Sequence, residues 1–399
     1  MAITRPGGLE VLVGAVVLDP DRAPGGSRPR VGLVLGAGGV LGAAWMTGAL
    51  PSVQDRLPCP INDVDVVIGT SAGSVLAAAL RCRSTIEEML AFQRGEAAGP
   101  LHDPSLLAAQ DGPLPPLPHW QIGSPPLLRA ALLTPHRVPP WVGASAWLPR
   151  GRGRHVTLRA TVHALHQQAR HRQEPRPPGS PAAPPHWAGE HWAGEHWASE
   201  HWAGEHWASE HWASEHWAGE HWAGEHWVSG RTWIVAVDYD SGQRVIFGRE
   251  GAPHAVLPDA VVASCSIPGW YEPVVIDGRR YVDGGVRSST SLGLMAGAGV
   301  DEVYVLAPMA STEPDRPRKP HERLERRLRH LITHGVMREA RALRSRGVRV
   351  TVITPGPEDL AVMGVNLMDP RRREAVLETS LRTCAAALGG QDHGQSRVA

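Results

Sequence analysis

Residues 31–42, VGLVLGAGGVLG, and residues 65–80, DVVIGTSAGSVLAAAL, are the stretches that decide the fold. Each begins with a short apolar run that predicts a buried strand, Val31–Leu35 in the first and Asp65–Ile68 in the second. A glycine-containing turn follows each run, and then comes a helical pattern of small and apolar residues. Because buried strands alternate with helices, we predict an α/β fold whose central sheet is mostly parallel and covered on both faces.

The same pattern returns nearer the C-terminus, over residues 231–390. There we predict a β-hairpin, a helix that ends before Pro268, and two more buried strands. In order, these elements are Thr232–Asp238 with Arg244–Phe247, Leu257–Ser264, Val303–Ala307 and Val348–Ile353. With 42% hydrophobic residues, the chain can bury a sizeable core.

Between these blocks, a repeat interrupts the fold. Eight copies of His-Trp-Ala-(Gly or Ser)-Glu run from His186 to Glu225, and a degraded ninth copy spans residues 226–230. A period of five matches neither helix nor strand, so no face of a regular element would stay apolar. We therefore predict a disordered insert. Metal binding by the recurring histidines is the alternative interpretation.

These patterns divide the chain into an extension, one domain and a tail. Residues 1–29 are predicted to be a flexible N-terminal extension, and residues 389–399 a polar tail. A single domain is predicted over residues 30–388, and it contains a Pro-rich variable region, residues 99–230, that includes the repeat insert at 186–230.

Composition excludes several classes of protein. The chain has 40 basic and 40 acidic residues, so no net positive field would attract nucleic acid. The four cysteines are far apart, which argues against a disulfide framework or zinc ribbon and favours reduced thiols in a cytoplasm: they are Cys59, Cys82, Cys265 and Cys384. The apolar run at residues 11–18 is too short to span a bilayer, so we expect a cytoplasmic protein, at most peripheral at the membrane.

A basic segment, residues 316–346, predicts a long amphipathic helix. It carries 11 Lys or Arg against 3 Glu. Its apolar residues are predicted to lie near one face: Leu324, Leu328, Leu331, Met337, Ala340 and Leu343. Such a basic face can contact anionic lipid head groups, although it is more often simply solvated.

The first motif that carries chemistry is the glycine-rich turn after the first strand, with Gly36, Gly38, Gly39 and Gly42. Glycines let backbone N–H groups point into a cavity at a helix N-terminus, where they can hold an anion or an oxyanion. A dinucleotide site is the rival interpretation, but no acidic residue in a strand setting follows about 20 residues later. A P-loop is excluded because the Gly-Lys-Ser/Thr ending is missing.

The second motif, Gly69-Thr70-Ser71-Ala72-Gly73, lies between a buried strand and a helix. That context is the one a nucleophile elbow requires, because the glycines at 69 and 73 relieve crowding at a sharp turn that exposes the Ser71 hydroxyl. The alternative is a tight turn in which Ser71 only caps the helix.

The third motif is Asp283-Gly284-Gly285, at the end of a short apolar run. It is either a simple turn or the source of a base, Asp283, for Ser71. A histidine base is poorly supported, because the late histidines lie in the basic helix or the polar tail: they are His321, His330, His334 and His393.

With all three motifs present in this order, the chain resembles the patatin-like phospholipases, lipid acyl hydrolases that use a Ser–Asp dyad. The segment 263–269, shortly before Asp283, also resembles that family. The resemblance covers about residues 31–98 and 231–310, plausibly continues to 388, and leaves the middle block outside. It implies a three-layer sandwich, with Ser71 as nucleophile, Asp283 as general base, and backbone N–H groups of Gly38 and Gly39 as the oxyanion hole.

Two residues depart from the family pattern. Ala37 stands where the family often has Gly, and Leu41 where Arg or Lys is usual. The backbone donors survive both changes, but the loss of the cation puts the type of substrate in doubt.

The resemblance implies hydrolysis of lipid or small ester substrates, with no metal or other cofactor. A catalytically inactive lipid-binding or scaffold protein on the same fold is the alternative, with the repeat as its interaction or metal-binding segment. The intact Ser71–Asp283 pair favours the enzyme. A triad esterase is a third interpretation, and it would require one of the late histidines.

Overall fold

The computed structural model describes residues 10–12, 15–18, 28–96, 118–173, 227–313, 315, 317 and 319–389. Its strands are β1 (Glu10–Leu12), β2 (Ala15–Leu18), β3 (Val31–Leu35), β4 (Val66–Thr70), β5 (His119–Ile122), β6 (Pro149–Arg150), β7 (Arg231–Asp238), β8 (Arg244–Phe247), β9 (Val274–Ile276), β10 (Arg279–Asp283), β11 (Glu302–Leu306) and β12 (Arg349–Ile353). Its α-helices are α1 (Gly39–Gln54), α2 (Ala72–Arg81), α3 (Ile86–Arg94), α5 (Pro125–Leu133), α6 (Pro140–Ser145), α7 (Val156–Gln173), α9 (Leu257–Cys265), α10 (Pro320–Arg344), α11 (Pro357–Met363) and α12 (Arg373–Gly389).

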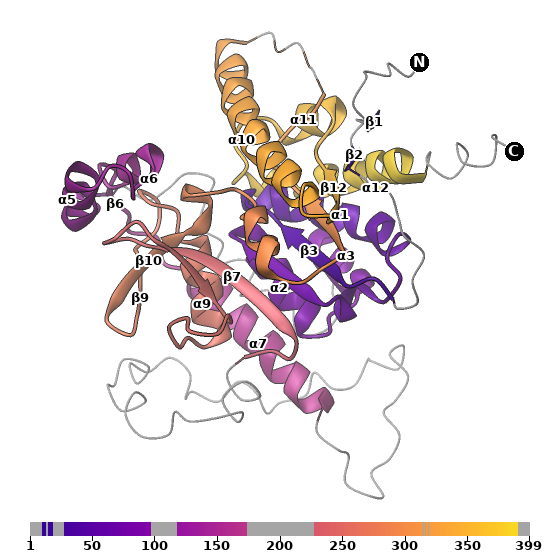
Figure 1. Cartoon of the computed structure of the whole chain (residues 1–399), viewed down its shortest axis with the longest axis horizontal. Helices are drawn as coiled ribbons and strands as arrows, with labels where there is room; N and C mark the ends of the chain where they lie inside the picture. The colour runs from indigo at the N-terminus through magenta and orange to yellow at the C-terminus, as the bar shows by residue number, and fades with distance from the viewer. Residues whose placement is uncertain are drawn as a thin grey trace, which may run out of the picture.

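A ten-stranded sheet forms the centre, in the order β1-β2-β12-β11-β3-β4-β7-β10-β9, with β8 paired to β7. The five strands from β12 to β7 are parallel, and antiparallel strands extend both sides. Side chains alternate between the faces, as in any strand. Leu33 and Leu35 pack in the core that includes α1, α2 and α9, whereas Val34 packs in the core that includes α10. The predicted three-layer α/β sandwich is confirmed (Figure 1).

Strand β7 brings two distant parts of the sequence together. Its N-terminal half pairs with β4, its C-terminal half with β10, and its middle with β8. A residue pairs with one strand on each edge, so the overlapping registers put β8 on one edge of β7 and both β4 and β10 on the other. The ends of these two strands therefore meet, because Thr70 lies opposite Val235 and Asp283 lies opposite Ala236.

The structure adds to the predictions for the middle block and corrects one of them. Residues 118–173, within the predicted Pro-rich variable region, are folded, and Leu127, Val138 and Val142 form a small core against β7 and β10. The degraded ninth copy of the repeat also joins the core, since Trp227 is only 5% exposed and its carbonyl lies 3.2 Å from His166 Nε2. Copies one to eight lie outside the described residues.

The N-terminal extension predicted over residues 1–29 contributes two strands to the sheet. Its apolar run supplies β2, which pairs antiparallel with β12, and β1 pairs with β2. Pairing satisfies backbone groups of β12 that would otherwise form an open edge. The domain limits themselves stay a prediction, and residues 390–399 of the predicted tail lie outside the described part of the chain.

The basic helix has the expected place but not the expected apolar face. Met337, Ala340 and Leu343 are buried against the sheet, whereas the more N-terminal leucines, Leu324 and Leu328, are 68% and 55% exposed. The reason is length: a helix of 25 residues spans about 37 Å, more than twice the length of a five-residue strand, so its N-terminal half extends past the sheet.

Within the described residues, each helix is too short or too polar to cross a lipid bilayer.

The close approach of β3 and α2 generates a stability prediction. A Cβ on Gly73 would lie 2.0 Å from the Leu35 carbonyl oxygen, and backbone cannot move aside cheaply. We expect Gly73→Ala to lower the free energy of unfolding by at least about 3 kcal/mol, measured by chemical denaturation.

The matched control is Gly335→Ala. Gly335 lies inside α10 with open space where a Cβ would stand, so alanine should raise stability by about 0.5–1 kcal/mol. Equal effects of the two substitutions would contradict the packing argument.

Candidate active site

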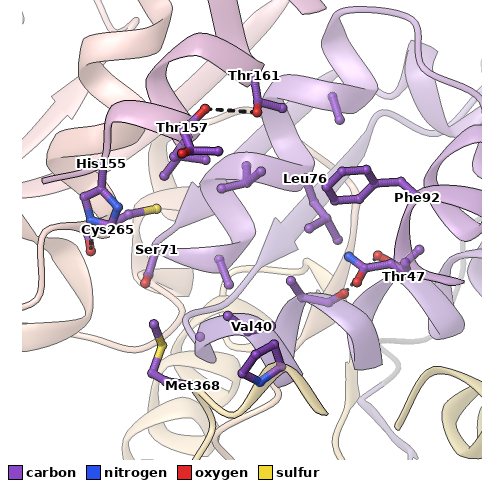
Figure 2. A pocket seen from close by; sticks show the side chains of 18 of the residues that line it. Val40, Thr47, Ser71, Leu76, Phe92, His155, Thr157, Thr161, Cys265 and Met368 are labelled. Carbon is purple, nitrogen blue, oxygen red and sulfur yellow. Dashed lines mark hydrogen bonds between the residues drawn. The ribbon is translucent and has the colours of Figure 1, made fainter. Parts of the chain in front are cut away.

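Ser71 lies at a sharp turn between β4 and α2, the strand–turn–helix context expected from the sequence. Its backbone has φ 54° and ψ −124°, a combination that side-chain-bearing residues rarely adopt. Gly69 makes the turn sterically feasible, because a Cβ there would lie 2.5 Å from Ser74 Cα. The strained turn places the Ser71 side chain in the wall of a pocket (Figure 2).

The glycine-rich loop presents backbone donors beside this turn. The N–H groups of Gly36 and Ala37 are occupied, by Leu306 O at 2.9 Å and Ser289 O at 2.7 Å. Within the described residues, the next two N–H groups, of Gly38 and Gly39, have no hydrogen-bond partner. They stand at the N-terminus of α1, where the helix dipole favours negative charge. The loop can therefore bind an oxyanion or another anion.

The other motif glycines are packed closely. Gly42 donates its N–H to Gly38 O at 2.8 Å and lies against Pro308, which holds the start of α1 in place. A Cβ on Gly284 would lie 2.4 Å from Val235 O, so only glycine fits where β10 ends against β7. The Gly285 N–H donates to Asp283 Oδ1 at 2.7 Å.

Asp283 ends β10 and is only 5% exposed. Burial raises the pKa of its carboxyl group from 3.8 to about 6, and hydrogen bonds from the Ser71 hydroxyl and the Gly285 N–H partly oppose that shift. The ends of β4 and β10 thus place Ser71 beside Asp283, close enough for the Ser71 hydroxyl to affect the pKa of the Asp283 carboxyl group. Near neutral pH the carboxyl group is mostly ionised and can accept the Ser71 proton.

The C-terminal end of α9 supports both residues, a role that the sequence alone did not assign. Ser264 Oγ accepts the Ser71 N–H at 2.9 Å and donates to Val235 O at 2.7 Å. Two residues later, the Ser266 carbonyl accepts the Asp283 N–H at 2.9 Å. Burial raises the pKa of the intervening Cys265 thiol, which therefore stays protonated and is no rival nucleophile. The segment's resemblance to the family was the available signal.

A pocket of about 270 Å³ opens beside Ser71 (Figure 2). Four helices contribute residues at the three- and four-residue spacing that keeps one helix face toward a cavity. These are Val40, Ala43 and Thr47 on α1; Val75, Leu76 and Ala79 on α2; Met89, Phe92 and Gln93 on α3; and Leu158, Thr161 and Leu165 on α7. From Ser71 to Ala79 the lining follows α2 for about 12 Å. Such a pocket suits an apolar chain.

His155, another lining residue, was missed by the sequence analysis because nothing in its local pattern distinguishes it. Burial lowers its pKa to about 4, so the ring is neutral. The ring stacks on Tyr271 at 3.7 Å and its Nε2 lies 3.1 Å from the Cys265 carbonyl. Because a carbonyl can only accept, this nitrogen carries the proton. This hydrogen bond from Nε2 holds the His155 ring in the pocket wall.

The late histidines that the structure describes do not line the pocket beside Ser71. His321, His330 and His334 are exposed on α10 and none lines the pocket, whereas His393 lies outside the described residues.

The structure also describes the two residues that depart from the family pattern. Leu41 is fully buried in the core and Ala37 is 5% exposed. Both side chains are uncharged, so neither position supplies a cation to the site. Among the lining residues the cation is Arg154, which pairs with Glu272 at 3.2 Å.

All four cysteines are buried and unpaired. No group of three or more His, Cys, Asp and Glu side chains within the described residues has the arrangement of a metal site.

The sequence profile of the family described as patatin-like phospholipase matches residues 33–180 and 229–295, more than half of the chain. The match includes residues 99–180, which the resemblance seen in the sequence left out, and its gap falls over the repeat.

Two solved structures are similar to the chain. The type III effector protein ExoU has 16% sequence identity and a TM-score of 0.32, over 96% of this chain and 64% of ExoU. VipD from Legionella pneumophila has 11% identity and a TM-score of 0.36, over 94% of this chain and 68% of VipD. The chain thus spans about two thirds of the length of each.

The raised pKa of Asp283 generates a prediction about stability and pH. A carboxyl group with a raised pKa stabilises the fold while protonated, and that contribution is lost as pH rises from about 4 through about 6. Asparagine resembles the protonated acid. We therefore expect Asp283→Asn to be more stable than wild type at pH 8 by about 2–3 kcal/mol, and nearly equal at pH 4, in chemical denaturation. Lower stability of the variant at pH 8 would contradict the assignment.

The Ser264 hydrogen bonds generate a second prediction. Ser264→Ala leaves the buried Ser71 N–H without its acceptor, so we expect a loss of about 1–3 kcal/mol in the free energy of unfolding. Ser345→Ala is the control, because that exposed hydroxyl bonds only to its own helix, and its effect should stay within about 0.5 kcal/mol. Thermal and chemical unfolding of both variants would measure the difference.

Proposed function

The chain belongs to the patatin-like phospholipase family, and we propose that it is a serine acyl hydrolase that cleaves carboxylic ester bonds of lipids. The observation that carries the proposal is the meeting of Ser71, at the end of β4, with the buried Asp283, at the end of β10, beside an apolar pocket that Ser71 lines. A hydroxyl paired with a buried carboxylate is an activated nucleophile, and the pocket offers a place for an acyl chain.

In the proposed mechanism, Asp283 accepts the proton of Ser71 as the serine oxygen attacks the ester carbonyl carbon. The carbonyl oxygen becomes an oxyanion, which the N–H groups of Gly38 and Gly39 stabilise by roughly 3–4 kcal/mol for a strong donor. The Ala72 N–H also has no partner in the described residues. It lies at the N-terminus of α2, where the helix dipole further stabilises the oxyanion.

The tetrahedral intermediate then collapses. The bond to the alcohol breaks, the proton held by Asp283 passes to the leaving alkoxide, and an acyl-serine remains. Water attacks this ester with Asp283 again as base, and the second collapse returns the proton to Ser71 and releases the carboxylic acid. Every step uses groups of this chain and water.

The pocket supports a lipid as substrate rather than a small polar ester. The lining is almost wholly apolar along α1, α2 and α3, so each methylene of a bound acyl chain gains about 0.8 kcal/mol from burial. Arg154, the cation among the lining residues, is a candidate contact for a phosphate group that would replace Glu272 as its partner.

The experiment is hydrolysis of a soluble short-chain chromogenic ester and of a vesicle phospholipid by wild type and variants. Ser71→Ala and Asp283→Asn should each lower kcat by at least about a thousandfold, because the pair acts as a unit. For wild type, kcat/KM should fall about tenfold per pH unit below pH 6, as Asp283 becomes protonated.

Two controls make the test specific. Asp359→Asn removes another buried carboxylate, 2% exposed on α11 and absent from the pocket lining, and should keep activity. Alanine at His330 or His334 should also keep it. A wild type inert on every ester, yet able to bind lipid, would instead support the non-catalytic alternative. Full activity of Asp283→Asn would eliminate the dyad.

A further inference from the structure

A small lobe, residues 118–156, carries an unusual share of exposed apolar surface. It contains β5, α5, α6 and β6, and Figure 1 shows it at one margin of the molecule, away from α10. Of the thirteen exposed large hydrophobic side chains in the described part of the chain, eight belong to the lobe. They are Trp120, Ile122, Leu132, Leu133, Trp141, Trp147, Leu148 and Val156.

These side chains lie outside the core of the lobe. Its own core is formed by other residues, including Leu127 and Val142, which pack against Tyr239 and Val282 of the main sheet. Trp120 is as exposed as in an extended chain, at 104%. Monomeric proteins seldom leave so much apolar surface in one region unless it contacts something.

The charge of the lobe indicates the chemistry of its partner. Residues 118–156 contain five arginines and no acidic residue. Arg154 pairs with Glu272, whereas within the described residues Arg129, Arg137, Arg150 and Arg152 have no ion pair. Exposed tryptophan and leucine beside unpaired arginine suit the boundary of an anionic bilayer, where aromatic rings enter the interface and cations meet phosphate groups.

The lobe also lies beside the candidate site and is fixed to it. Helix α6 contacts the turn η4 (Gly284–Val286) that directly follows Asp283. The end of the lobe, at Arg154 and His155, lines the pocket. The Tyr239 hydroxyl donates to Ser145 O at 3.0 Å, which holds α6 on the sheet.

We propose that the exposed apolar side chains of the lobe insert into the surface of an anionic phospholipid bilayer, with its arginines on the lipid phosphates, and so bring the pocket to its substrate. The role of this bilayer binding in bringing substrate to the pocket rests on the proposed function, but the binding itself does not.

The rival surface is the exposed part of α10, with Leu324, Leu328 and Leu331. The lobe is the better candidate, because it has no acidic residue, whereas α10 carries three glutamates and two of its arginines are paired within the protein. Arg326 pairs with Asp315 and Glu325, and Arg329 pairs with Glu325. The exposed stripe of α10 also has no tryptophan.

The experiment measures co-sedimentation of the Ser71→Ala protein with vesicles of phosphatidylcholine, with and without phosphatidylserine. On that background, the triple substitution Trp120→Ser, Trp141→Ser, Trp147→Ser should lower the partition coefficient by about tenfold or more. Raised salt should weaken binding to the anionic vesicles. The matched control, Leu324→Ser, Leu328→Ser, Leu331→Ser, should bind as its parent does. Because all six side chains are exposed, both variants should keep the parent's Tm.

Three outcomes overturn the proposal. One is no vesicle binding by the parent, and another is loss of binding only in the α10 variant. The third is a change of oligomeric state in the tryptophan variant without vesicles, which would make a second copy of the chain the occupant.

Activity separates this proposal from the proposed function. With Ser71 restored, the tryptophan variant should hydrolyse a soluble short-chain ester like wild type but vesicle phospholipid about tenfold more slowly. A wild type that binds vesicles through the lobe yet hydrolyses neither substrate would refute the proposed function alone.

Discussion

The end-to-end meeting of β4 and β10 on one edge of β7 is the constraint on which the rest of the structure depends. Thr70 and Asp283 lie opposite neighbouring residues of β7, so the backbone register alone brings Ser71 and the carboxylate together. Glycines occupy the positions where a Cβ would collide with backbone, at 73 and 284. Ser264 Oγ accepts the Ser71 N–H and the Ser266 carbonyl accepts the Asp283 N–H, so the end of α9 is tied to both strand ends.

Local sequence predicted much of this fold, because its strands are continuous apolar runs followed by glycine turns. The Gly69–Gly73 turn and the hairpin of β7 and β8 could be placed for that reason. Contacts set by tertiary packing could not be predicted. His155 is held by Tyr271 and Cys265, more than 100 residues away, and residues of β7 and β10 complete the core of the lobe.

The candidate site concentrates two unfavourable features in a rigid setting. Ser71 holds a positive φ, and Asp283 is a buried acid whose ionised form is disfavoured. Each would relax if its surroundings could move. The parallel strands on one side and the ends of α1, α2 and α9 on the other prevent this, since all of them are anchored by buried core residues.

The strand order also has a consequence for how the chain is made. β3 and β4 lie between β11 and β7, which are encoded far downstream. During synthesis at about 5–20 residues per second, the outer edge of β4 would stay unpaired for roughly ten seconds or more before β7 emerges. The outer edge of β3 would stay unpaired longer, until β11 emerges. Open apolar edges are sites of misassembly. The nascent N-terminal third, in which β3 and β4 can pair only with each other, is therefore the stage most exposed to misassembly.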